Sequence, residues 1–140
     1  MAVGEISKND ESELRRNGWV VADTNPLSDP MEYYRYIRRS LGEFTVAKEQ
    51  YVKPRSGWFS DRSVCYLAAG RPVVTQNTGF EKLIPTGEGL FGFTTEDDAL
   101  AAIEEIHSDY PRHSKAALAI AEEYFGAEKV VGEMVKTMAL

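Results

Sequence analysis

The residues best suited to ligand chemistry lie where a glycine-containing loop runs into a helix start, at Ser-Gly-Trp-Phe-Ser-Asp-Arg, residues 56–62. Ser60 is a typical N-cap residue, and the first backbone N–H groups of a helix have no partner inside the helix. These groups and the positive end of the helix dipole favour an anion. Ser56, Gly57 and Ser60 are therefore candidate binding residues.

Arg62 falls in the first turn of the same predicted helix. The helix dipole disfavours a cation at this place, which is easier to understand if the guanidinium meets a phosphate. An alternative stays open, in which Arg62 is a surface residue paired with Asp61 or Glu43.

A second polar loop, Gln-Asn-Thr-Gly-Phe at residues 76–80, carries amide, hydroxyl and glycine groups that could cradle a ligand. Its candidate residues are Gln76, Thr78 and Gly79, and a plain turn before a short helix is the alternative.

Cationic candidates precede the first loop: Lys48, Lys53 and Arg55. They belong to a stretch from Arg35 to Arg71 with eight basic and three acidic residues, in a chain of net charge −6. Such a basic island suits a small anion, and a solvated charged face is the alternative.

The elements that must position these residues alternate between apolar strands and capped helices. Strands are predicted at 19–22, 43–47, 72–75 and 90–93. Helices are predicted from a cap at Asp29 to Leu41, from Ser60 to Gly70, at 99–107 behind a capping box at 95–98, and at 114–125 and 128–138. Inward-facing residues are expected to be Val64, Leu67 and Ala68 of the second helix and Leu100, Ile103 and Ile106 of the third. The last two helices, broken at Gly126, are expected to fold back over the sheet.

This alternation predicts an α/β domain of three layers, with about four mostly parallel strands. Ligands of such sheets bind beyond the carboxyl ends of the strands, so all three candidate loops should converge at one edge. Residues 1–16 show no apolar periodicity and are expected to be a frayed or disordered lead-in. Residues 17–140 are expected to form a single domain.

Several functions are disfavoured by composition and missing motifs. The negative net charge argues against nucleic-acid binding. No apolar run is long enough for a membrane span and the N-terminus is polar, so a cytoplasmic protein is expected. The single Cys65, interpreted as a packed core thiol, excludes an internal disulfide, and His107 and His113 lack zinc-ligand spacing. Neither a dinucleotide-binding nor a phosphate-loop pattern occurs, and we expect no metal and no cofactor. His113 is interpreted as a structural or surface residue.

Three stretches together resemble a known family: Gly42 to Lys48, Ser56 to Arg62, and Tyr66 to Val74, which contains Gly-Arg-Pro-Val-Val. With Gln76 to Phe80 and Pro85 to Leu90, they look like the C-terminal, donor-binding domain of GT-B glycosyltransferases, in the bacterial glycosyl transferases group 1 branch. The resemblance covers roughly residues 18–125. It implies a partial Rossmann-like domain that binds a nucleoside-diphosphate sugar, with the loop at 56–62 against the sugar and phosphates.

The chain departs from this family at two places. The family pattern has two glutamates separated by seven residues, and Gly57 and Cys65 stand at those positions. In the family, the acceptor site and catalytic base belong to an N-terminal domain that these residues do not contain. The resemblance therefore implies no catalytic residue here and a need for an acceptor-binding domain or partner chain. It also implies further strands before residues 19–22, without which a sheet edge is exposed.

Three hypotheses remain at this stage. The first is the nucleotide-sugar-binding half of a glycosyltransferase. The second is a non-catalytic accessory or binding module that kept the fold, which the missing glutamates favour. The third is an unrelated α/β enzyme such as a phosphatase or reductase.

Overall fold

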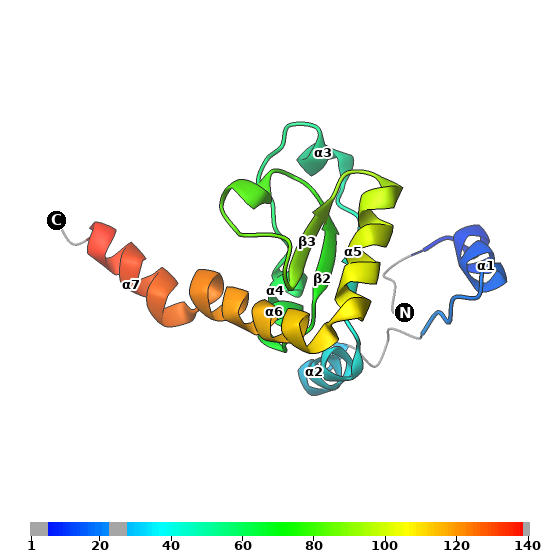
Figure 1. Ribbon diagram of the computed structural model, residues 1–140, viewed down its shortest axis with the longest axis horizontal. Coiled ribbons are helices and arrows are strands. Elements are labelled where there is room, and N and C mark those ends of the chain that lie inside the picture. Colours follow the sequence, from blue (N-terminus) through cyan, green and yellow to red (C-terminus); the bar gives the residue numbers. More distant parts are fainter. Residues whose placement is uncertain (1–5, 23–27, 139–140) are drawn as a thin grey trace. The chain divides into compact units, whose positions relative to one another are not determined.

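A computed structural model describes residues 6–22 and 28–138 of the chain (Figure 1). The chain divides into two compact units between Tyr36 and Ile37. This boundary differs from the expected one, which separated residues 1–16 from a single domain at 17–140. The second unit holds the sheet and all ten candidate binding residues.

The first unit contains a helix where the sequence predicts an irregular lead-in. Helix α1 spans Lys8–Arg16, and the Ser7 hydroxyl caps it by accepting from the Asp10 N–H at 3.1 Å. Glu11 and Arg15 form an ion pair one turn apart, at 2.8 Å. Caps and pairs of this kind stabilise a helix without an apolar stripe, and α1 has no buried residue. Residues 8–16 are therefore helical, where the sequence led us to expect a frayed or disordered lead-in at 1–16.

The strand predicted at 19–22 is not formed as expected. Trp19 and Val20 are at least half exposed, and Ala22 alone takes part in an isolated bridge. The next element is the predicted helix, α2, at Pro30–Arg39. Its cap is the predicted Asp29, whose carboxylate accepts from the N–H groups of Met31 and Glu32 at 2.8 and 3.0 Å.

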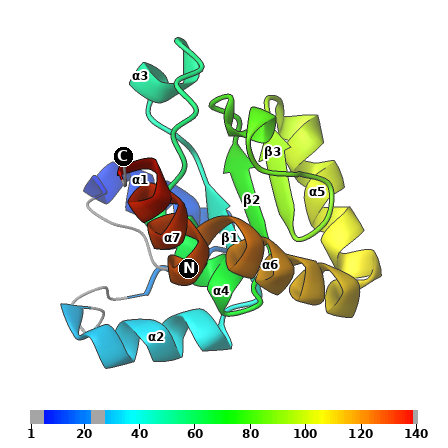
Figure 2. The ribbon, with the colours of Figure 1, turned by 90° about the vertical axis from the view of Figure 1, so that its left-hand side faces the viewer.

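The sheet has three parallel strands in the order β1-β2-β3, which Figure 2 shows side by side. They are β1 at Glu43–Thr45, β2 at Val73–Gln76 and β3 at Leu90–Phe93. The described residues therefore give an α/β fold with three of the four expected strands. β1 stops before its predicted end at residue 47, because the Ala47 N–H donates to the Gln76 side chain, at 3.2 Å, instead of continuing the ladder.

Helices cover both faces of the sheet. Helix α5, at Glu96–Ser108, packs against Val74 and Phe93 through Ala99, Ala102 and Ile106. Helices α4 (Asp61–Ala68) and α6 (Tyr110–Phe125) pack together and against the sheet. Because successive strand residues point to opposite faces, Phe44, which stacks on Phe93, lies on the α5 face. Glu43 and Thr45, which bond to Arg62 of α4, lie on the other face.

Two helices bury only part of the side that was predicted, since Leu67 of α4 and Ile106 of α5 are buried as expected but their predicted neighbours are not. In α5, Leu100 and Ile103 are 60% and 38% exposed, and alanines face the sheet instead. Small side chains let the helix approach closely, which a search for large apolar residues misses. In α4 the buried residues are Ser63, Tyr66 and Leu67, while Ala68 and Cys65 are exposed, so Cys65 is not a core thiol.

The predicted capping box of α5 is confirmed. Thr95 accepts from the Asp98 N–H, and the Asp98 carboxylate accepts from the Thr95 N–H at 2.9 Å. The hydrogen bond from the Thr95 backbone is the main reason that the pKa of Asp98 is lowered, with a second from Thr94. Within residues 6–22 and 28–138, no helix combines the length and the apolarity that crossing a bilayer requires.

The two C-terminal helices behave differently. α6 begins at Tyr110, earlier than predicted, because Asp109 caps it and Pro111 fits its first turn. It buries Ala117, Ile120 and Ala121 and covers the sheet as expected. Helix α7, at Ala127–Met138, has no buried residue and extends away from the sheet in Figure 1. The prediction that both helices fold back over the sheet is therefore wrong for α7.

Gly89 packs tightly against the backbone of α6 where the chain enters β3. Its φ is +71°, and a Cβ atom there would lie 2.3 Å from the Ala117 backbone nitrogen. Its N–H donates to Nδ1 of the fully buried His113 at 3.2 Å, and its carbonyl accepts from the Val73 N–H at 2.9 Å. His113 is thus a structural residue, one of the two roles expected for it.

We predict that Gly89→Ala lowers the free energy of unfolding much more than Gly87→Ala, as measured by urea denaturation. Gly87 also has a positive φ, +108°, but a Cβ atom there meets nothing within 4 Å. Both variants carry backbone strain of about 1–3 kcal/mol. Only Gly89→Ala adds a clash with helix backbone, about 1–3 kcal/mol more. Equal losses in the two variants would contradict the close packing of β3 and α6.

Candidate functional site

The two candidate loops are joined to each other by hydrogen bonds. The Gly57 N–H donates to the Thr78 carbonyl at 2.9 Å, and the Thr78 hydroxyl donates to the Trp58 carbonyl at 2.5 Å. Thr78 is buried, and Gly79 beside it has a φ of +101°. A Cβ atom on Gly79 would lie 2.9 Å from the Arg55 carbonyl oxygen. The loops therefore meet closely enough that only glycine fits at position 79.

The loop after β1 reaches the same edge. Ala47 donates its N–H to the Gln76 side chain at 3.2 Å, and the Asn77 N–H donates to the Phe93 carbonyl at the end of β3 at 2.8 Å. Lys48 follows Ala47 and is exposed. The predicted convergence of three loops at the carboxyl ends of the strands is thus present in the structure.

The start of α4 lies beside these loops. Ser60 is the N-cap residue, as predicted, and it is buried, but its side chain makes no capping hydrogen bond. The Arg62 N–H is bonded to the Asp61 carboxylate at 3.0 Å. Ser56 is exposed, and its hydroxyl donates to the Tyr51 carbonyl at 3.2 Å.

Arg62 adopts the paired arrangement that the sequence left open. Its Nε donates to the Glu43 carboxylate at 2.5 Å, and its Nη2 donates to the Thr45 hydroxyl at 2.9 Å. The Glu43 side chain is 5% exposed, whereas that of Arg62 is 51% exposed. The second Glu43 oxygen is buried and has no hydrogen-bond partner among the residues that the structure describes. Arg62 therefore ties α4 to β1, and its charge is largely balanced by Glu43.

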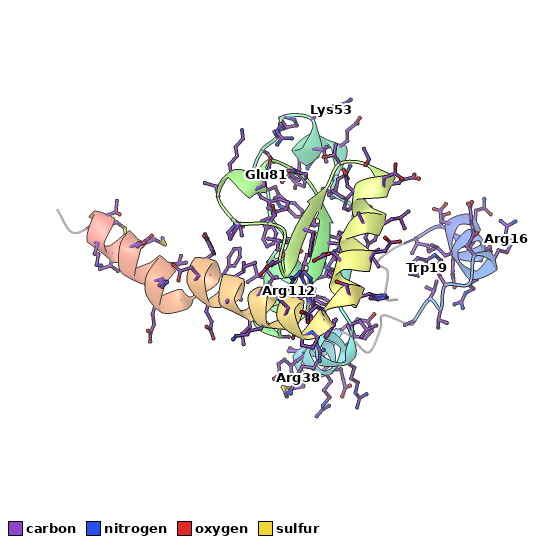
Figure 3. The ribbon with its side chains drawn as sticks, viewed as in Figure 1. Arg16, Trp19, Arg38, Lys53, Glu81 and Arg112 are labelled. Atoms are coloured by element: carbon purple, nitrogen blue, oxygen red, sulfur yellow. The ribbon has the colours of Figure 1, made fainter. Side chains whose placement is uncertain are left out.

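The other cations of the basic island are dispersed. Lys53 pairs with Glu49 at 2.7 Å, both well exposed, and Arg55 pairs with Glu81. Figure 3 shows Lys53 beside α3, which spans Glu49–Val52. Arg71 donates to the Tyr110 hydroxyl at 3.0 Å and to the Arg38 carbonyl. The positive charge counted along the sequence is therefore reduced by local partners, while Lys48 has no acidic side chain within ion-pair distance among the described residues.

Aromatic residues at this edge were missed by the sequence reasoning. Tyr51 of α3 stacks on Trp58, with ring centroids 4.7 Å apart and planes 5° from parallel. Phe59 lies between Phe80 and Phe125, at 5.1 and 5.5 Å. Three aromatic residues at positions 51, 58 and 59, outside any long helix or strand, were the available signal.

A cavity of about 300 Å³ lies apart from this edge. It is bounded by the start of β1, the residue before β2, and α5, and none of the ten candidate binding residues lines it. Its walls are mostly apolar and include Leu41, Phe44, Val74, Ile103 and Tyr110. The candidate site is therefore a surface formed by loops rather than this cavity.

The groups gathered at the carboxyl edge are hydroxyls, amides, backbone N–H groups and cations. Of the nearby acids, Glu43 and Glu81 are each paired with an arginine side chain, and Asp61 accepts from the Arg62 N–H. This set suits the binding of an anionic or polyhydroxylated ligand. No protein-family model, curated protein or solved structure matches the chain. The fold and these residues therefore carry the functional conclusion.

We predict that Arg62→Ala lowers the free energy of unfolding by about 1–3 kcal/mol, because it leaves the buried Glu43 carboxylate without its partner. Lys53→Ala, which removes an exposed pair, should cost less than about 1 kcal/mol. Chemical denaturation of both variants measures the difference. The double variant Glu43→Gln with Arg62→Ala should recover part of the loss, since no charge is then stranded. Equal stability of the two single variants would show that the Glu43–Arg62 pair is energetically unimportant.

Proposed function

We propose that this chain is a nucleoside-diphosphate-sugar-binding domain of the GT-B glycosyltransferase type, with a partial Rossmann-like fold. The observation that carries the proposal is the joining of three loops at the carboxyl ends of a parallel sheet, beside the start of α4. Open α/β sheets bind ligands at this place. The residues that form it are those on which the family resemblance rests.

The diphosphate would lie at the N-terminus of α4, near Ser60 and the first backbone N–H groups. Lys48 supplies an exposed cation on the neighbouring loop. Arg62 contributes only if it can serve two anions. Its side chain is half exposed and a guanidinium has five N–H donors, so a phosphate oxygen and Glu43 can share it. Ser56, Gly57, Gln76, Thr78 and Gly79 then shape the surface around the ligand.

Transfer of the sugar would need an acceptor-binding domain or partner chain. Two apolar features are open for such contacts: the stripe of α7 formed by Val131, Met134 and Val135, and the half-exposed ring of Phe44 beside α5. Exposed apolar patches of this kind commonly mark interaction surfaces.

A second candidate function is a non-catalytic binding module with the same ligand. It is favoured by Gly57 and Cys65, which stand where the family pattern has its glutamates. Cys65 is exposed on α4. Position 65 is thus accessible to a ligand or partner but has a thiol where the family pattern has a carboxylate.

We predict that uridine diphosphate, titrated into the labelled protein, shifts backbone NMR signals of residues 56–62 and 76–79. Arg62→Ala should weaken its binding by about 1.5–3 kcal/mol, the usual worth of a charge-assisted hydrogen bond. Glu43→Gln should instead strengthen binding, because it frees the guanidinium from a competing carboxylate. Raised salt should weaken binding in the wild-type chain.

The matched control is Lys115→Ala, which removes an exposed cation of α6 outside the proposed site. Its affinity should equal that of the wild-type chain. Shifts confined to other regions would exclude the proposed site. Unchanged affinity of Arg62→Ala together with a lowered melting temperature would show that this arginine is structural only.

We predict that the purified chain alone transfers no sugar from any nucleotide donor to added acceptors. The physical reason is that the proposed surface binds one reactant and contributes no base to activate the other. A coupled assay that follows release of the nucleoside diphosphate measures this. Robust turnover by the chain alone would contradict the division of roles proposed here.

A further inference from the structure

The stacked pair Tyr51 and Trp58 is built from two separate segments. Tyr51 belongs to α3, and Trp58 belongs to the loop before α4. The rings are nearly parallel, so Tyr51 covers one face of the indole. Trp58 is nevertheless 37% exposed. More than a third of Trp58 is thus open to solvent at the carboxyl edge of the sheet.

The backbone on both sides of this pair is held in place. The Trp58 N–H donates to the Ser56 hydroxyl at 3.3 Å, and the Trp58 carbonyl accepts from the buried Thr78 hydroxyl at 2.5 Å. Ser56 in turn donates from its N–H and its hydroxyl to the Tyr51 carbonyl, each at 3.2 Å. One small network therefore fixes both rings. A preorganised aromatic surface loses little conformational entropy when a ligand stacks on it.

The position of this surface relates it to the proposed anion site. Trp58 follows Gly57, which bonds to the Thr78 loop, and precedes the N-cap Ser60 by two residues. The cations Lys48, Lys53 and Arg55 lie on the same arm of chain. A ligand with an anionic group at the start of α4 would therefore find the Trp58 ring in the same short segment of chain.

We propose that the exposed face of Trp58 is a stacking platform for the heterocyclic base of the bound nucleotide, with Tyr51 as its support. This inference rests on the proposed function and specifies how the non-phosphate part of the ligand is recognised. A planar base offers the flat π surface that an exposed indole face accepts. Stacking of this kind tolerates different bases, so the platform contributes affinity rather than choice of base.

The test uses Trp58 as its own reporter. The chain has two tryptophans, so Trp19→Phe leaves Trp58 as the only indole. In this background, the uridine, adenosine and guanosine diphosphates should each quench and shift the tryptophan emission. Inorganic pyrophosphate, which carries the anion without a base, should bind with little change in emission.

Calorimetry then separates the base from the phosphates. Trp58→Leu should weaken binding of a nucleoside diphosphate by about 10–100-fold, the usual effect of losing one stacked base, and leave pyrophosphate binding unchanged. Trp58→Phe should keep part of the affinity, and Trp19→Leu should keep all of it. If Trp58→Leu does not fold, the emission of the Trp19→Phe protein still decides the question.

Failure of the inference differs from failure of the proposed function. If nucleoside diphosphates bind near Ser60 but Trp58 emission is unchanged and Trp58→Leu binds normally, the platform is excluded and the anion site stands. If no nucleoside diphosphate binds anywhere, the proposed function is excluded and the platform with it. If quenching is as strong with pyrophosphate as with nucleotides, Trp58 responds to the anion and not to a base, which also overturns the inference.

Discussion

The arrangement of the candidate site depends on Thr78. This buried residue accepts from the Gly57 N–H and donates to the Trp58 carbonyl, so it bonds to the neighbouring loop in both directions. Two loops that are separate in sequence thereby become one surface at the end of the sheet. Without these bonds, the start of α4, the aromatic pair and the Gln76 loop would be free to move apart. A buried side chain that satisfies backbone groups of a neighbouring loop is a strong way to fix such a loop.

The net positive charge at this edge depends on which basic residues are paired with acids, and not only on how many basic residues the sequence contains. Arg62 and Glu43 form a pair in which the acid is buried and the cation is half exposed. Glu43 stays paired with Arg62, because a buried carboxylate without a counter-ion is costly. The half-exposed guanidinium of Arg62 can still approach a ligand. The site is therefore less positive than the sequence count indicates, and the anion binding proposed for it would depend on backbone N–H groups as well as on cations.

The sequence predicted the elements that have strong local signals. The cap at Asp29, the capping box at Thr95 and Asp98, and strand β3 at Leu90–Phe93 are all confirmed. It failed where burial depends on neighbours. Leu100 and Ile103 are apolar and correctly spaced, but the sheet lies against the alanines of α5. The stretch at 19–22 has the composition of a buried strand, yet Val20 is exposed. Helix α1 was missed because its stability comes from a cap and an ion pair.

For the candidate site, the sequence by itself determined which loops come together, because polar and glycine residues that directly follow strands of a parallel sheet must gather at one edge. It could not determine how the side chains in those loops choose partners. In the sequence, the Arg62 guanidinium could pair with Asp61, Glu43 or a ligand. It pairs with Glu43 in the structure, because β1 brings that carboxylate to the sheet face on which α4 lies. Likewise, nothing in the sequence pairs Tyr51 with Trp58, and their rings stack only because the segment between β1 and α4 folds back on itself. Strand and helix signals are local, whereas charge pairing and ring stacking depend on distances that exist only after the chain has folded.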